Sequence, residues 1–151
     1  MGGIADLELL RRLDDPRDPE SPPGFDWRRA DAALHAMARD LAAALAVPGL
    51  EVEGSESIQD ASFHGQIVLP MAELLPGQSG PVLLCTSNFG RLAAVRPEAA
   101  LQPEVLSAVR GVLAAHDYVY VPAELLGEPY TGPTTLDAQV PTWWDRYFEY
   151  V

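Results

Sequence analysis

Lysine is absent from this 151-residue sequence: all ten basic residues are arginine, against 22 Asp and Glu residues. The net charge is −12 and the isoelectric point lies near 4.4. Nucleic acids and anionic membranes are bound mainly through basic side chains, so this charge argues against either as a partner. Arginine without lysine, together with abundant Ala, Gly and Pro, is typical of a GC-rich bacterial gene.

Cysteine is almost absent too. The single Cys85 excludes an internal disulfide and any zinc site built from cysteines. It stands inside an apolar run, where a thiol usually behaves as a small buried hydrophobe. We therefore expect Cys85 to be structural.

Targeting signals are not visible in the sequence. The first residues, 1–6, lack the basic segment and the apolar stretch of a signal peptide. No run approaches the roughly 20 apolar residues that a membrane helix requires. The expected location is the cytoplasm.

The common catalytic motifs are missing as well. The sequence contains no Gly-x-Ser-x-Gly elbow, no P-loop and no Gly-x-Gly-x-x-Gly run. Its three histidines, His35, His64 and His116, fall on separate predicted elements. Residues 87–91 (SNFGR) could hold an anion through backbone amides beside an arginine, although a hairpin turn requires the same residues. We predict no catalytic residue, no metal ligand and no cofactor.

Length and composition indicate one folded domain with an N-terminal extension. Hydrophobic residues make up 48% of the chain and charged residues 21%, as in an ordinary globular protein. Four prolines and a glycine between residues 14 and 24 interrupt the first helical pattern. We expect residues 1–24 to form an N-terminal helix and a Pro-rich acidic linker, and residues 25–151 a single α+β domain. The first helix is either packed onto the domain or detachable.

The pattern of apolar residues predicts the elements of this domain. Helical spacing runs from residue 27 to about 46, with a stripe that starts at Trp27, and again from 103 to about 116. Two apolar runs around the turn-forming residues Asn88 and Gly90 predict a hairpin over residues 81–95. Further strands are expected at 50–53, 62–69 and 118–122, the last an edge strand because Pro122 ends it, and one helical turn at 71–75.

These elements predict an α+β fold. Strands that follow one another through short links imply an antiparallel sheet of about four to five strands, with the two long helices on one face. A short aromatic helix over 143–150 completes the domain, and Thr142 and Asp145 stand at the spacing of a capping box.

This C-terminal helix concentrates the aromatic residues: 143–150 holds five of the twelve in the chain. Helical geometry places Trp143 and Tyr147 on one face and Trp144 and Phe148 on another. Both faces could pack inside as a C-terminal clamp. Alternatively, one set remains on the surface for a partner.

The acidic charge and the aromatic helix favour a binding protein. We predict partner-binding residues in the C-terminal region and on an acidic strand; they are Trp144, Phe148, Asp145, Glu149, Tyr130, Glu51 and Glu53. The function expected is an immunity or inhibitor protein that neutralises a basic toxin or enzyme by surface complementarity. A dimeric secretion chaperone or adaptor that binds an extended client segment, and an enzyme of unknown class, are the alternatives. The sequence contains no internal repeat.

Overall fold

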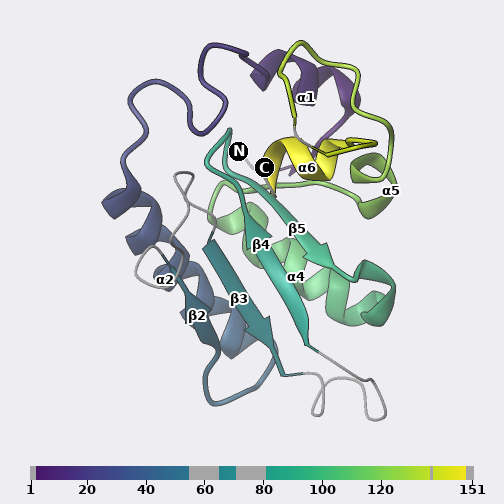
Figure 1. Cartoon of the computed structure of the whole chain (residues 1–151). Helices are drawn as coiled ribbons and strands as arrows, with labels where there is room; N and C mark the ends of the chain where they lie inside the picture. Colours follow the sequence, from purple (N-terminus) through teal and green to yellow (C-terminus); the bar gives the residue numbers. More distant parts are fainter. Residues whose placement is uncertain (1–2, 55–64, 71–80, 137, 149–151) are drawn as a thin grey trace.

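The protein folds around one mixed sheet covered by helices (Figure 1). The computed structural model describes residues 3–54, 65–70, 81–136 and 138–148. In these ranges the sheet has six strands in the order β1-β6-β5-β4-β3-β2. The strands are β1 (Gly3–Ile4), β2 (Glu51–Glu53), β3 (Gly65–Leu69), β4 (Val82–Thr86), β5 (Leu92–Arg96) and β6 (Val119–Tyr120). The predicted helical turn at 71–75, and residues 62–64 of a predicted strand, lie outside the described residues.

The antiparallel part of the sheet follows the prediction. Strands β2, β3, β4 and β5 are antiparallel neighbours, and β4 and β5 form the expected hairpin. Gly90 in its turn has φ +58°, and a Cβ there would lie 2.6 Å from the side chain of Leu13. Glycine is therefore required at this position both by the backbone conformation and by the close approach of the N-terminal helix.

The rest of the sheet corrects the prediction of a purely antiparallel arrangement. Strand β6 pairs with β5 and with β1, in both cases parallel. It therefore lies inside the sheet, and the prediction of an edge strand at 118–122 was wrong. Helix α4 (Pro103–Ala115) is the crossover that a parallel β5–β6 pair needs, and Pro122 is harmless because β6 ends at Tyr120.

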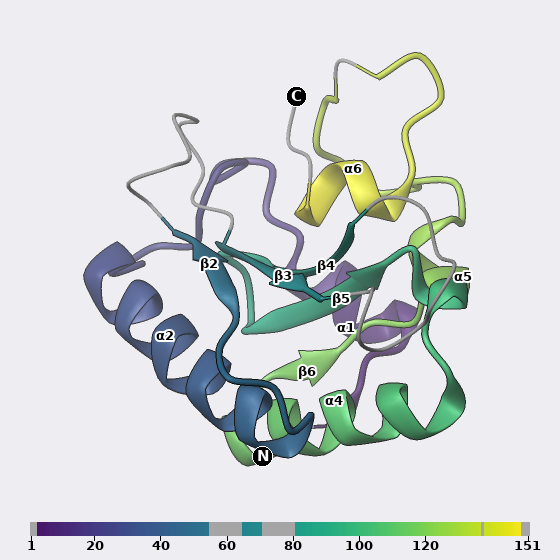
Figure 2. The same cartoon turned by 90° about the horizontal axis from the view of Figure 1, so that it is seen from below.

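The two long helices, α2 (Trp27–Ala44) and α4, lie together on one face of the sheet (Figure 2). The predicted stripe of α2 is buried at Leu34, Met37 and Leu41, and it packs with Ile67 and other strand residues in a first core cluster. Trp27, the first residue of the predicted stripe, is instead 49% exposed. It stands in the first turn of α2, beyond the sheet-facing part of the stripe.

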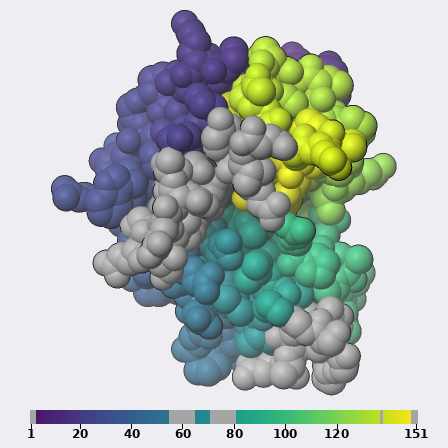
Figure 3. Space-filling view, in the orientation of Figure 1, coloured from purple at the N-terminus to yellow at the C-terminus, as the bar shows by residue number. Residues whose placement is uncertain are grey.

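A second core cluster lies on the opposite face of the sheet, at the end where the β4–β5 turn is found. Three short helices form it: α1 (Leu7–Leu13), α5 (Ala123–Leu126) and α6 (Trp143–Tyr147). Leu10, Trp143 and Tyr147 are fully buried there, and Cys85 is buried from the strand side as expected. Figure 3 shows the N-terminal and C-terminal segments side by side at this end of the surface.

A buried ion pair fastens the linker to α6. The Arg146 guanidinium donates from Nε to Asp14 Oδ1 at 2.7 Å, and both side chains are fully buried. Asp14 also accepts hydrogen bonds from Thr134 Oγ1 at 2.8 Å and from the Tyr130 hydroxyl, while Arg146 donates to the Pro19 carbonyl at 3.0 Å. The N-terminal helix is thus packed onto the domain and tied to its C-terminal helix.

Tyr147 gives this second cluster a pH dependence. Its hydroxyl donates to the Leu10 carbonyl at 2.5 Å, and burial, reinforced by the nearby Asp14 charge, raises the pKa of Tyr147 well above its ordinary value. Burial and a hydrogen bond to Glu98 likewise raise the pKa of Tyr120. The folded state therefore favours the neutral phenols more strongly than the unfolded state does.

We expect the free energy of unfolding to be steady between about pH 7 and about pH 10, the unfolded tyrosine pKa, and to fall above that value. Above this pH, each tyrosine that stays protonated in the folded state lowers the free energy of unfolding by about 1.4 kcal/mol per pH unit. Urea denaturation at pH 9, 10 and 11 measures the slope. Tyr147→Phe should make the alkaline slope shallower, although it lowers stability at neutral pH by about 1 kcal/mol because one hydrogen bond is lost. An unchanged slope in this variant would contradict the assignment.

Candidate protein interface

A surface cavity of about 360 Å³ lies between the end of β5, α5 and the start of α6. We call it the α6 groove, and define it by Arg96, Glu98, Leu126, Trp144 and Asp145. Its residues come from three separate parts of the chain, which the sheet and the second core cluster bring together. A groove of this kind can receive a side chain or a loop from another protein.

Trp144 forms the aromatic wall of the groove. Its ring stacks on Phe148 at 5.0 Å between centroids and 23° between planes, and the Arg96 guanidinium lies 4.9 Å from its ring centroid. The indole Nε1–H is buried and has no acceptor among the described residues. An unsatisfied buried donor lowers stability, so the indole N–H makes no favourable contribution to the fold.

The two carboxylates of the groove are held in place by internal hydrogen bonds. Asp145 Oδ2 accepts from the backbone N–H of Thr142 at 2.7 Å and from its hydroxyl at 3.0 Å, in the predicted capping arrangement. Glu98 Oε2 accepts from the Ala123 N–H at 3.1 Å and from the Tyr120 hydroxyl. In each carboxylate, one oxygen accepts these hydrogen bonds and is thereby held in place. The other oxygen takes no part in them.

Exposed acidic residues add negative charge close to the groove. Glu124 on α5 and Glu128 just after it are exposed, and each is next in sequence to a residue that lines the groove. With Glu98 and Asp145 they make four carboxylates against one guanidinium, that of Arg96. The surface around the groove therefore carries a surplus of negative charge, on a protein that is already strongly acidic.

The predicted site residues of the C-terminal region are only partly at the surface. Trp144 and Asp145 line the groove. Phe148 is 5% exposed and lies beneath the Trp144 ring, so its role is to support that ring. Tyr130 packs edge-on against Trp143 at 4.8 Å and bonds to Asp14, which makes it part of the second core cluster. Glu149 lies outside the described residues.

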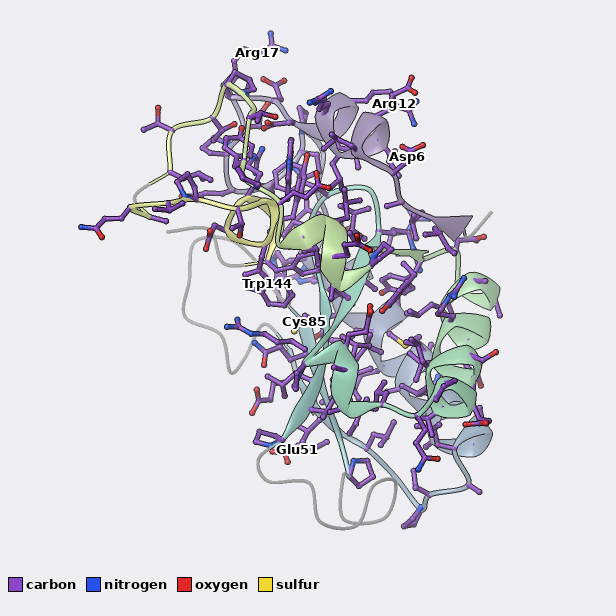
Figure 4. The ribbon with its side chains drawn as sticks, turned by 90° about the vertical axis from the view of Figure 1, so that its right-hand side faces the viewer. Asp6, Arg12, Arg17, Glu51, Cys85 and Trp144 are labelled. Carbon is purple, nitrogen blue, oxygen red and sulfur yellow. The ribbon has the colours of Figure 1, made fainter. Side chains whose placement is uncertain are left out.

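The predicted acidic strand is not part of the same surface. Glu51 and Glu53 belong to β2, the strand at the far edge of the sheet from β1 and β6. Figure 4 shows Glu51 and Trp144 well apart along the molecule. The structure therefore does not bring these two glutamates to the α6 groove.

Sequence reasoning missed Glu98, Arg96, Glu124 and Glu128. All four are separated from α6 by an irregular segment of more than ten residues, and no pattern in the sequence indicates that the two regions meet. One signal was available: residues 118–122 have the composition of a strand and lead directly into α5. They indicate that residues near 124 lie next to the sheet.

The part of the chain that the structure describes offers no metal cluster. Within it, no three His, Cys, Asp or Glu side chains gather as a metal site would require. None of the helices in the described ranges is both long and apolar enough to cross a membrane.

Comparison with protein-family models, with curated proteins and with solved structures finds no match. Inference about the role of this chain therefore rests on the geometry and charge of its surface.

Proposed function

We propose that this protein is an inhibitor of the immunity type, which neutralises a basic toxin or enzyme by covering its cationic site with the α6 groove. The observation that carries the proposal is the combination, in one surface cavity, of a partly exposed tryptophan with carboxylates that are already oriented. A toxin that acts on a polyanion must present a cationic surface, and this groove is complementary to such a surface.

Each component of the groove corresponds to a known contribution to binding. Tryptophan is among the residue types that dominate interface energies, most of all at the centre of a well-packed patch. Carboxylates fixed before binding lose little freedom on association, which improves affinity. The net charge of −12 accelerates the encounter with a basic partner through long-range attraction.

Charge reversal at Glu124 on α5 and at Glu128, just after this helix, tests the groove. The double variant Glu124→Arg/Glu128→Arg should lower the association rate with the partner by about ten-fold or more at low salt, because it turns the local surplus of negative charge into a positive one. The proposal predicts a gene for a basic, toxin-like protein beside the gene for this chain, and the product of that gene is the partner to use. Stopped-flow or surface-plasmon measurements at several ionic strengths give the rate.

A matched control is available on β2. The variant Glu51→Arg/Glu53→Arg makes the same change of net charge on β2, an edge strand of the sheet. It should lower the association rate much less. If both double variants slow association equally, the groove is not the binding site. If the neighbouring gene encodes no toxin-like protein and no basic partner is recovered, the inhibitor proposal fails. A stable homodimer in sedimentation would instead support a chaperone or adaptor.

A further inference from the structure

A second cavity, of about 380 Å³, lies where the Pro-rich linker crosses the start of α2 and the β4–β5 turn. We call it the linker cavity. Linker residues Pro22–Asp26 form one wall, and its polar lining includes Arg29, Ser87, Asn88, Arg91 and Tyr118. It shares no lining residue with the α6 groove. Its volume lies within the range of small-molecule binding sites in proteins.

Asn88, one of the residues that line this cavity, has a buried side-chain acceptor without a donor among the described residues. The residue is 5% exposed, and its Nδ2 donates to the Glu20 carbonyl at 2.9 Å. This bond to a carbonyl settles which side-chain atom is the nitrogen. The Oδ1 atom is buried and accepts no hydrogen bond from any described residue. A buried acceptor without a donor is unfavourable, and a ligand N–H or O–H would satisfy it.

Arginine side chains make the same cavity locally basic. Arg29 is exposed on the first turns of α2, and Arg91 is held over the Tyr118 ring at 4.5 Å while it donates to the His116 carbonyl at 2.6 Å. Both line the cavity of a protein whose net charge is −12. Guanidinium groups are the preferred partners of phosphate and carboxylate oxygens.

The other polar groups of the lining are compatible with an anion. Asp26 is the acidic residue there, but its Oδ1 caps α2 by accepting from the N–H groups of Arg28 and Arg29, at 3.1 and 3.3 Å. Ser87 Oγ accepts from the Phe89 N–H at 3.3 Å, which leaves the serine hydroxyl proton to donate elsewhere.

The walls between these polar groups are aromatic and apolar. They come from Phe25, Tyr118 and the two linker prolines, Pro22 and Pro23. A ligand that fits therefore needs an anionic group for the arginines, a donor for Asn88 Oδ1 and a flat body for the walls. A nucleoside monophosphate has all three, and its one or two charges make it a very different ligand from the nucleic-acid polymers that the net charge disfavours.

We propose that the linker cavity binds a nucleoside monophosphate, with its phosphate at Arg29 and Arg91 and a base or sugar donor at Asn88 Oδ1. This site is separate from the α6 groove and does not depend on the inhibitor role.

Calorimetric titration of the full chain tests the proposal. The probes are adenosine monophosphate and guanosine monophosphate, with inorganic phosphate and adenosine as partial ligands. At least one nucleotide should bind ten-fold or more tightly than inorganic phosphate and than adenosine, because only the nucleotide engages the arginines and the walls together. If neither nucleotide binds more tightly than inorganic phosphate, the proposal is overturned.

Two arginines of the same helix supply matched variants. Arg29→Ala should weaken nucleotide binding about ten-fold or more, because charge-assisted hydrogen bonds to the phosphate are lost. Arg39→Ala removes the same charge from α2 outside the linker cavity, and should leave the affinity unchanged within two-fold. Equal effects of the two variants would show a non-specific charge effect and would also overturn the site. Asn88→Ala, with its melting curve recorded first, should lower the affinity for the nucleotide while leaving that for inorganic phosphate unchanged.

Discussion

Replacing Asp14 by alanine is expected to lower the free energy of unfolding by about 3–5 kcal/mol, because the substitution leaves the buried Arg146 guanidinium without its counter-charge. Both side chains are fully buried, and Arg146 Nη2 already lacks a hydrogen-bond partner among the described residues. The remaining bond to the Pro19 carbonyl cannot replace a carboxylate. Urea denaturation followed by far-ultraviolet circular dichroism measures the loss.

The same linker contains an exposed pair that serves as the control. Asp15 and Arg17 are joined at 2.9 Å, and the Arg17 side chain is 86% exposed. The Arg17 guanidinium lowers the pKa of Asp15 to about 2, but solvent screens this pair. Arg17→Ala should therefore leave the midpoint of urea denaturation nearly unchanged. If Asp14→Ala lost no more stability than Arg17→Ala, the buried Asp14–Arg146 pair would not stabilise the packing of the N-terminal segment against α6.

Trp143→Ala is expected to be nearly as damaging, with a loss of about 3–5 kcal/mol and a fall in melting temperature of about 10 °C. Trp143 is fully buried, packs edge-on against Tyr130 and stacks on Tyr147 at 6.0 Å between centroids. Removal of the indole leaves a cavity at the centre of the second core cluster, which neighbouring aromatic rings are too rigid to fill. Thermal denaturation by calorimetry gives both quantities.

Trp27→Ala is the matched control for this substitution. Trp27 is 49% exposed, and the Arg28 guanidinium lies 5.2 Å from its ring centroid. The same change of side chain should therefore alter the melting temperature by no more than a few degrees. Comparable losses for the two tryptophans would mean that the second core cluster contributes little to stability.

The elements whose residues are close in sequence could be predicted. Helix α2 has a long apolar stripe, and the β4–β5 hairpin has the turn formers Asn88 and Gly90 between two apolar runs. Both signals depend on residues within a few positions of one another. Local physical chemistry therefore determined these elements, and the structure confirms them.

The mixed character of the sheet could not be predicted in the same way. Strand β1 has two residues, which is too few to show the alternation of a strand. Its parallel pairing with β6 joins Gly3 to Val119 and Ile4 to Tyr120, residues more than a hundred positions apart. The strand–helix–strand order of β5, α4 and β6 was the one signal for parallel strands. Because Pro122 ends residues 118–122, the prediction made this segment an edge strand instead.

The candidate interface was predicted in part for a related reason. Helical spacing separates Trp143 and Tyr147 from Trp144 and Phe148, but residues of both sets pack with α1, α5 and the strands in the second core cluster. Phe148 is therefore buried with the first set, and only Trp144 remains partly at the surface. The side chains that surround Trp144 come from α5 and from the end of β5, which no local pattern connects to α6.

The Asp14–Arg146 contact has a consequence for synthesis of the protein, because it joins residues 132 positions apart. On the ribosome, α1 emerges early, whereas the surface that will bury Leu10 is complete only after residues 143–148 have emerged. The β3–β4–β5 neighbours and α2 can associate before that point, since their contacts are closer in sequence. The apolar side of α1 therefore stays uncovered, and accessible to chaperones and proteases, until residues 143–148 have been translated.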